Sequence, residues 1–443
     1  MLDFFPERST ITIACNIILK SQNRRWIIFK DGKVMIKKKY SNVYKLLAGR
    51  VATNIADSLF YMAILWYFKE TGHSPLMVAL IFSIEAGIDI ISFGFGPLID
   101  RLSVKKLLKY STLIQIVISV IIACVLYLKQ NNVIIDIFLL LLFGISTILS
   151  SIIYPTEYKL LPVLVEKKDL LHFNGLFQVS YKILDLVLDG ITTFIIATTS
   201  ISITIIISAV IFTIALFIYA RVQINMLAKD VLKSEEYFTG SYLKDLQVGW
   251  VTLKSESNII ELILPLCVVN FFFGIYDVGL PYFAESYIHD SVIGYGGLLM
   301  VSSLGSILGA LVIQHFKLGK KNMEAFITLC FLGAGIFRLL VPLTVKTSVT
   351  FALISSAISS LWITMMNIDF ETLVQTSFSS AILGRIDTIN DSILSLMIPL
   401  GTFGGSWIIE KFGSISTQYV YGVALLVSSI YYFGVTRYRK RLK

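Results

Sequence analysis

Long apolar stretches alternate with short polar segments along the chain from residue 46 onward. About 20 apolar residues in a helix cross roughly 30 Å of hydrocarbon, so each stretch predicts a membrane-spanning helix. The first group of expected helices is Leu46–Phe68, Leu76–Ile99, Leu107–Leu128, Val133–Pro155, Asn174–Ala197 and Ile201–Ala220. The second group is Ile259–Leu280, Val292–Gln314, Met323–Val345, Val349–Leu373, Ile386–Ile409 and Ser416–Val435. The pattern predicts an all-α membrane protein with about 12 transmembrane helices in two six-helix bundles.

A polar segment separates the two groups and divides the chain into parts. We expect a basic N-terminal extension at 1–45, a first bundle at 46–221, a central loop at 222–258, a second bundle at 259–436 and a basic tail at 437–443. Within the extension, Trp26 to Ile36 is typical of a β-hairpin that turns at Asp31-Gly32. Two successive bundles are typical of transporters that bind their substrate between repeated halves.

Lysine and arginine are distributed unevenly between the connecting segments. The segments on one side, which include both termini, hold most of these residues. Those on the other side hold little beyond Lys69, Lys129, Lys346 and Lys411. Because loops rich in lysine and arginine remain in the cytoplasm, we expect both termini on the cytoplasmic face of the cell (plasma) membrane.

Composition excludes several classes of protein. Hydrophobic residues make up 56% of the chain, charged residues only 15%, and the mean hydropathy is +0.77. A soluble domain has about 25% charged residues. The net charge of +9 lies mostly in loops that fix topology and contact lipid headgroups, so we expect no nucleic acid partner. The chain has no phosphate-binding Gly-x4-Gly-Lys motif, no nucleophile–base pair and no metal-ligand spacing, so we expect no enzyme, cofactor or metal site.

The connection between the second and third expected helices has a distinctive sequence, Gly96-Pro-Leu-Ile-Asp-Arg-Leu-Ser-Val-Lys-Lys106. The residues that resemble the loop signature of the major facilitator superfamily are Gly96, Asp100, Arg101, Lys105 and Lys106. A degenerate copy with the glycine and the bases but no Asp-Arg pair follows the eighth expected helix, at 309–321. The resemblance implies a gating loop in which Asp100 accepts from a facing helix end or from an arginine, for which Arg385 is the candidate.

Further stretches resemble the branch of this superfamily that includes macrolide-efflux and enterobactin-export proteins. They are Arg50 and Asp57 with Thr71–Pro75, Pro155–Asn174, Leu280-Pro281, Gly384–Ile386 and Pro399–Gly405. The resemblance covers about residues 45–436 and implies the major facilitator fold, with access alternating around a central cavity. The chain departs from many antiporters of the superfamily at Leu186–Thr192, where those proteins carry Gly-Pro-x-x-Gly-Gly.

Three carboxylates lie midway along expected helices. A charge at mid-membrane costs about 2.5–3.5 kcal/mol on insertion scales, so such residues are candidates for function. Glu85 and Asp89 share one helical face at i and i+4, and two close carboxylates favour sharing one proton. We therefore expect Asp57, Glu85 and Asp89 to couple transport to protons. The alternative is a buried pair that hydrogen-bonds to neighbouring helices.

Other charged residues are candidates for a cavity or for ion pairs, namely Arg50, Lys182, Asp185, Asp189 and Asp277. Lys182, Asp185 and Asp189 share one face of the fifth expected helix, where an ion pair and a substrate contact are equally good interpretations. Asp277 lies nearer the outer end of its helix and could also meet water. We expect Arg338 to be paired or to extend toward the membrane surface.

Two pairs of glycines are spaced four residues apart, Gly305 with Gly309 and Gly401 with Gly405. This spacing permits two helices to approach closely. By resemblance, their helices lie at the seam between the two bundles, and we expect the glycines to smooth that seam.

Together these features predict a secondary active exporter, a proton-coupled antiporter of a small amphipathic molecule such as a macrolide-like drug or a siderophore. Its partners would be this small-molecule substrate, protons and the lipid bilayer, and the protein would act as a monomer that confers antibiotic resistance. Two alternatives stay open. One is a transporter-shaped receptor or accessory membrane protein without transport, and the other is an exporter of a lipid or peptide.

Overall fold

The computed structural model describes residues 28–30, 33–35, 40–71, 74–91, 95, 103–128, 132–166, 169–223, 257–289, 292–316, 323–377, 390 and 392–442. Strands β1 (Ile28–Lys30) and β2 (Lys33–Met35) form an antiparallel pair in which Ile28 lies opposite Met35. This register confirms the predicted hairpin.

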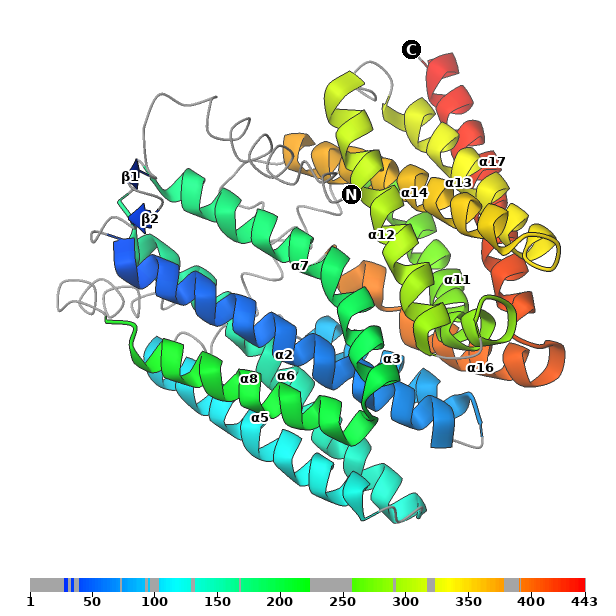
Figure 1. Cartoon of the computed structure of the whole chain (residues 1–443). Coiled ribbons are helices and arrows are strands. Elements are labelled where there is room, and N and C mark those ends of the chain that lie inside the picture. The colour runs from blue at the N-terminus through cyan, green and yellow to red at the C-terminus, as the bar shows by residue number, and fades with distance from the viewer. Residues whose placement is uncertain are drawn as a thin grey trace, which may run out of the picture.

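Twelve helices are described, and they fall into two groups (Figure 1). The first bundle contains α2 (Ser41–Thr71), α3 (Leu76–Ile91), α5 (Val104–Tyr127), α6 (Val133–Leu164), α7 (Leu170–Thr198) and α8 (Ile201–Ala220). The second bundle contains α11 (Ser257–Tyr287), α12 (Val292–Phe316), α13 (Met323–Thr344), α14 (Val349–Ser377), α16 (Ile398–Phe412) and α17 (Ile415–Leu442). Each overlaps one expected helix, so the all-α prediction is confirmed.

One predicted boundary is wrong, and a proline is the reason. The fourth helix was expected to end at Pro155, but α6 continues through this proline to Leu164. A proline removes one backbone donor without ending a membrane helix when neighbouring groups compensate. The eleventh was expected from Ile386, which lies outside the described residues. Residues 390 and 392–395 are helical, and α16 follows from Ile398 with a proline in its first turn, where proline is favoured.

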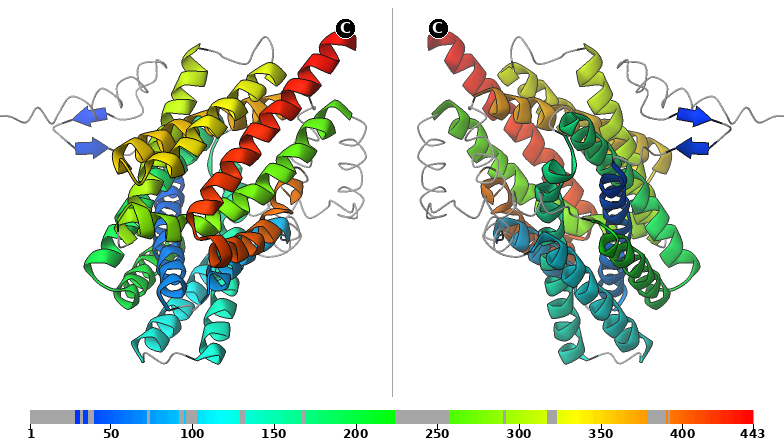
Figure 2. Two further views of the ribbon diagram at one scale, coloured as in Figure 1. Left: turned by 90° about the vertical axis from the view of Figure 1, so that its right-hand side faces the viewer. Right: turned by 90° about the vertical axis from the view of Figure 1, so that its left-hand side faces the viewer.

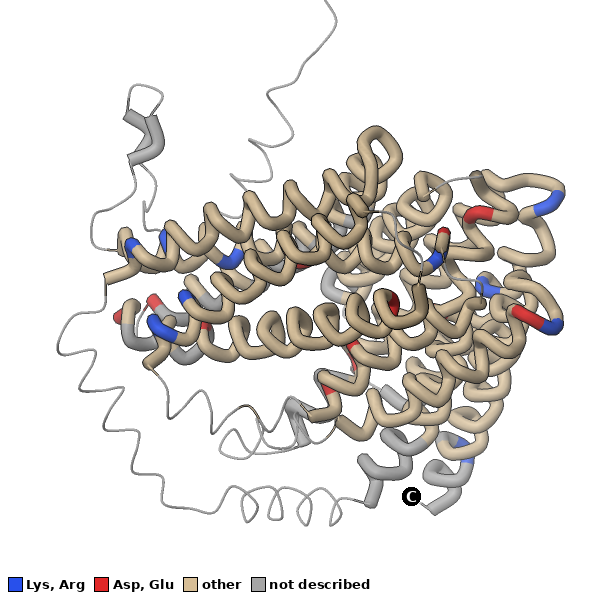
Figure 3. The backbone as a smooth tube through the Cα atoms, turned by 90° about the horizontal axis from the view of Figure 1, so that it is seen from below, with Lys and Arg blue, Asp and Glu red and all other residues tan. Residues whose placement is uncertain are grey.

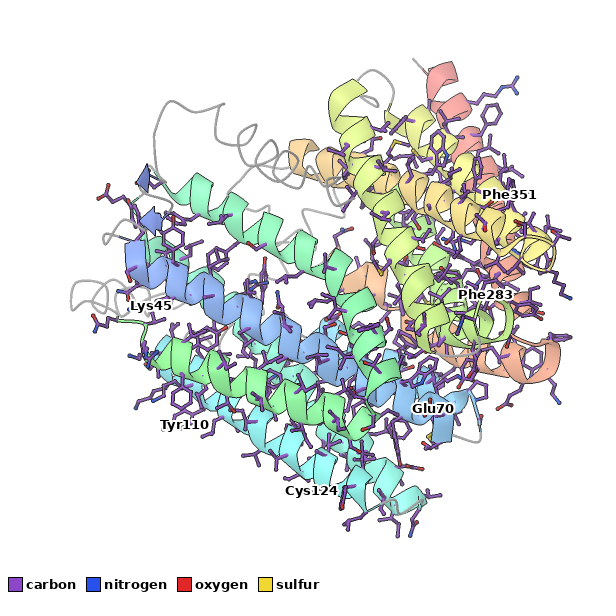
Figure 4. The ribbon with its side chains drawn as sticks, viewed as in Figure 1. Lys45, Glu70, Tyr110, Cys124, Phe283 and Phe351 are labelled. Carbon is purple, nitrogen blue, oxygen red and sulfur yellow. The ribbon has the colours of Figure 1, made fainter. Side chains whose placement is uncertain are left out.

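Ten of the described helices are long and apolar enough to cross a membrane. The two others are α3, of which 16 residues are described, and α7, which is interrupted by charged residues. The outward-facing surface is apolar, as Tyr110 on α5 and Phe351 on α14 illustrate with 60% and 47% exposure (Figure 4). Charged residues gather mainly near helix ends and are sparse inside the bundles (Figure 3). These features describe a multi-pass membrane protein.

Each bundle has a terminal end, where α2 or α11 begins, and a far end, where α2 or α11 ends. Lys45 and Glu70 mark the two ends of α2 (Figure 4). The bundles meet where α7 packs on α12 and α3 packs on α16, and they diverge toward their terminal ends (Figures 1 and 2). At this seam Gly190 of α7 faces the side chain of Met300, and Gly296 of α12 faces Thr193.

The glycine pairs singled out in the sequence lie inside the second bundle instead. Gly305 and Gly309 of α12 face the backbone of α14, and Gly401 and Gly405 of α16 face α11. The predicted close approach is confirmed, and α12 and α16 lie at the seam as predicted, but the glycines face their own bundle rather than the other one. The pairs bring neighbouring helices of one bundle into backbone contact, because a side chain at these positions would overlap the facing helix.

Candidate functional site

A cavity of about 350 Å³ lies inside the first bundle. Helices α2, α3, α6 and α7 line it, and its ionisable and hydroxyl groups include Asp57, Tyr61, Glu85 and Ser150. The remaining lining residues combine small polar side chains with apolar ones, among them Phe60 and Phe143. Two of the three predicted coupling carboxylates therefore share one cavity.

Asp57 is held by hydrogen bonds from two helices. The amide Nε2 of Gln115 on α5 donates to Asp57 Oδ1 at 3.0 Å, and the hydroxyl of Ser150 on α6 donates to the same oxygen at 2.6 Å. Gln115 Nε2 also donates to Ser150 at 2.8 Å, which links the two donors. This network fixes the position of the carboxylate at the cavity wall.

Glu85 of α3 has acidic residues of both bundles in its neighbourhood. The hydroxyl of Tyr61 is within hydrogen-bonding reach of its carboxylate, and the charges of Asp89 and Asp277 act on it. Asp89 is exposed and does not line the cavity. Asp89 is thus a neighbour of Glu85, as their spacing predicted, and the structure adds Asp277 of the second bundle, a neighbour that the sequence did not predict.

A second cavity, of about 500 Å³, lies inside the second bundle between α11, α12, α13, α14 and α17. Asp277 and Arg338 line it together with the aromatic residues Phe273, Tyr276 and Tyr421. The rings of Tyr276 and Tyr421 stack with their centroids 4.9 Å apart. Asp277, one of the predicted cavity candidates, thus faces a cavity rather than the far end of its helix.

Arg338 was expected either to be paired or to extend toward the membrane surface, and the second alternative is wrong, because the side chain is only 2% exposed. Its Nη1 donates to the Tyr276 hydroxyl at 3.0 Å and lies 3.5 Å from the hydroxyl of Ser356. Its guanidinium carbon lies 4.6 Å from the Tyr276 ring centroid and 5.8 Å from that of Tyr421. Among the described residues, the ion pairs are Arg50–Glu157 and Lys69–Glu285, and neither involves Arg338.

Arg50, a buried arginine of the first bundle, has a carboxylate partner. Its Nη1 donates to Glu157 Oε2 at 2.8 Å, and both side chains are buried. The other oxygen of Glu157 accepts from the Tyr219 hydroxyl at 2.6 Å. Pairing of Arg50 was predicted, but Glu157 was missed because the fourth helix was expected to end two residues before it. Allowing that helix to continue through Pro155 would have placed this acid inside the bundle.

Several predicted residues lie outside the described part of the chain. Gly96, Asp100, Arg101 and Arg385 are among them, and so are the side chains of Lys182, Asp185 and Asp189. Of the remaining gating-loop residues, Lys106 is exposed, while Lys105 Nζ donates to the carbonyl oxygen of Val222 at 2.7 Å. This bond ties the start of α5 to the end of α8. Within the described ranges, no cluster of His, Cys, Asp and Glu has metal-binding geometry.

The far ends of the two bundles are joined by a charged and aromatic contact. Lys69, near the end of α2, forms an ion pair with Glu285 of α11. The Lys69 ammonium also lies 4.5 Å from the ring centroid of Trp66, which stacks on Tyr295 of α12 with centroids 6.4 Å apart. An ammonium beside an indole face gains about 0.5–1 kcal/mol or more when it is desolvated.

Two hydrogen bonds extend this joint along α3 and α16. The Ser74 hydroxyl donates to Glu410, and the hydroxyls of Ser83 and Thr402 lie 2.7 Å apart. The contact of Ser74 lies at the far ends, and that of Ser83 lies further along α3 and α16. The terminal ends of the two bundles diverge (Figure 1). The arrangement joins the bundles at one face of the membrane.

Comparisons with known proteins bear on what these cavities do. A family model described as Major Facilitator Superfamily matches residues 46–390. Macrolide efflux protein A of Streptococcus pyogenes is 21% identical over 381 residues, which cover 85% of this chain and 92% of that protein. Among solved structures, the nucleoside transporter NupG has a TM-score of 0.69 at 12% identity, covering 89% of this chain and 98% of its own. A D-xylose-proton symporter has a TM-score of 0.65 at 12% identity, with coverage of 89% and 97%. At this identity the two structures show a shared fold.

Proposed function

The chain belongs to the major facilitator superfamily of membrane transporters, and from that premise we propose that it is a proton-coupled secondary exporter of a small amphipathic compound. The observation that carries the proposal is the pair of cavities, one in each bundle, with Asp57 and Glu85 in the first and Asp277 in the second. The likeness to a macrolide efflux protein supports export as the direction. A macrolide-like drug or a siderophore is the proposed cargo.

Asp57 and Glu85 carry the coupling in this proposal, with Asp89 as an accessory acid beside them. A buried carboxylate charge is costly, and either a proton or a cationic group removes that cost. The hydrogen bonds from Gln115 and Ser150 hold Asp57 in place in both protonation states, since only one of its oxygens is engaged. A proton that enters from outside and leaves inside would thereby drive the change of conformation.

Alternating access requires one joint to open while another closes. The Lys69–Glu285 contact closes the far ends, so it must break when the cavities open to that face. We propose that the gating loop with Asp100 and Arg101 closes the terminal ends in that alternative state, with Arg385 as its partner. The terminal ends, and both chain termini, would face the cytoplasm of the cell membrane, and the protein would act as a monomer surrounded by lipid.

A susceptibility panel tests the proposal. Cells with and without the chain are exposed to amphipathic antibiotics and to toxic siderophore analogues. We expect the chain to raise tolerance to at least one compound, and Asp57→Asn to abolish that gain at an equal amount of protein in the membrane. Tolerance that is unchanged for every compound, or that survives Asp57→Asn in full, would contradict proton-coupled export.

A further inference from the structure

Arg338 stands in the second cavity without a role in the coupling proposed above. The side chain comes from α13, is only 2% exposed, and lines the cavity of about 500 Å³. A buried guanidinium stays charged, so its environment must supply acceptors or negative charge. Which groups supply them decides whether Arg338 is a structural element or part of a binding site.

The protein satisfies Arg338 only in part. Its Nη1 makes the contacts with Tyr276 and Ser356, and the buried Nε has no hydrogen-bond partner in the described part of the chain. Arg50, a buried arginine of the first bundle, differs from Arg338, because Arg50 Nη1 lies 2.8 Å from the carboxylate oxygen Oε2 of Glu157. Asp277 lines the same cavity as Arg338 but is not in an ion pair with it.

A guanidinium has the geometry that a carboxylate prefers. Arginine presents parallel N–H donors in a rigid fork, and a carboxylate binds this fork with both oxygens. Nη1 of Arg338 contacts two hydroxyls, Nε is buried without a partner in the described part of the chain, and the described residues place no carboxylate on this fork. Apolar surface lies next to it, because the rings of Tyr276, Tyr421 and Phe273 form one aromatic cluster with centroid distances of 4.9 to 6.0 Å.

We propose that this cavity binds an organic acid, with the carboxylate on the guanidinium of Arg338 and the apolar body against Tyr276, Tyr421 and Phe273. The volume lies within the range of about 300–1,000 Å³ that is usual for small-molecule sites. The inference rests on the proposed function and narrows its cargo to amphipathic compounds that carry an acidic group.

Thermal unfolding of the purified full-length protein tests the site. The probes are 2-naphthoic acid, 4-phenylbutyric acid and indole-3-acetic acid, each compared with its own amide. We expect at least one acid to raise the melting temperature more than its amide does, and Arg338→Gln to remove the difference. Lys346→Gln is the matched control, since it removes one positive charge from an exposed position outside the cavity and should keep the difference. Equal effects of all acids and amides, or a difference that survives Arg338→Gln, would overturn the site.

The stability of the variants separates a binding site from a structural arginine. An incompletely paired buried charge is held at a cost, so Arg338→Gln should keep or raise the melting temperature of the ligand-free protein. A large loss of stability would indicate a structural role and contradict the inference. Arg338→Lys is a second, independent test, because it keeps the charge but loses the fork. It should weaken acid binding about tenfold or more, and unchanged binding would count against the site.

Failure of the site and failure of the proposed function remain distinguishable. The unfolding assay needs no gradient and no transport. An acid that binds through Arg338 but is not moved by vesicles containing the protein would refute transport and leave the site intact. Efflux of compounds by a protein that shows no Arg338-dependent acid binding would refute the site alone.

Discussion

Glu285→Gln should release the far ends of the two bundles from one another. Glu285 of α11 forms an ion pair with Lys69 of α2. The Lys69 side chain is 5% exposed, and the Glu285 side chain is 32% exposed. The substitution keeps the shape of the side chain and removes its charge. Lys69 then remains buried against Trp66 without its carboxylate, and the joined state becomes less stable than the separated state.

The magnitude follows from the burial of the pair. Removing one partner of a fully buried ion pair costs about 3–5 kcal/mol, whereas an exposed pair contributes about 0–1 kcal/mol. This pair is intermediate, because Glu285 is about one third exposed and Lys69 keeps its cation–π contact with Trp66. We expect about 1.5 kcal/mol, which shifts the equilibrium between joined and separated far ends about tenfold.

Double electron–electron resonance measures this equilibrium directly. Spin labels at Val133, which begins α6, and at Thr347, which precedes α14, report the separation of the far ends from exposed positions in the two bundles. The labels require a background in which the native cysteines are replaced. In Glu285→Gln the ratio of the longer to the shorter distance population should rise about tenfold.

Two further variants make the result decisive. The double variant Lys69→Gln/Glu285→Gln removes the stranded charge as well, so it should shift the populations less than Glu285→Gln alone. Lys346→Gln, which removes a charge from an exposed position, should leave them unchanged. A distance distribution in Glu285→Gln identical to that of the wild type would refute the conclusion that the pair holds the far ends together.

Three other predictions follow from the structure and the sequence. Gly305→Ala should destabilise the protein by about 1–3 kcal/mol, because its methyl group would overlap the α14 backbone, whereas Gly297→Ala, with open space at its Cβ, should be neutral or stabilising in thermal unfolding. Glu157→Gln should cost about 3–5 kcal/mol, because it removes one partner of a buried ion pair; a melting temperature equal to that of the wild type would contradict this. Asp100→Asn should impair efflux while the amount of protein in the membrane stays constant, and full efflux would reduce the loop to a plain turn.

The alternation of apolar and polar segments was sufficient to predict the helices. Membrane helices satisfy their own backbone, so their positions depend on local sequence alone. The same local reasoning placed Asp57 and Glu85 at mid-membrane, where the structure shows them lining a cavity. The end of the fourth helix was predicted wrongly at Pro155, because proline ends helices in water but is tolerated in a membrane helix where neighbouring helices compensate.

Contacts between helices could not be predicted from spacing. Gly305 was recognised as a site of close approach, but the sequence does not state which helix approaches it, and the structure shows α14 rather than the other bundle. Asp277 is a neighbour of Glu85 only because the two bundles pack together. Likewise, Arg338 has no pairing signal along its own helix, since its surroundings come from α11, α14 and α17.

Efflux from energised membrane vesicles tests the central claim most directly. Vesicles with the wild-type chain are loaded with a compound identified by the susceptibility panel, and its release is followed with and without a protonophore. We predict release that stops when the proton gradient collapses and that is lost in Asp57→Asn with the gradient intact. Release that persists after collapse of the gradient and in Asp57→Asn would contradict proton-coupled export through the cavity that Asp57 lines.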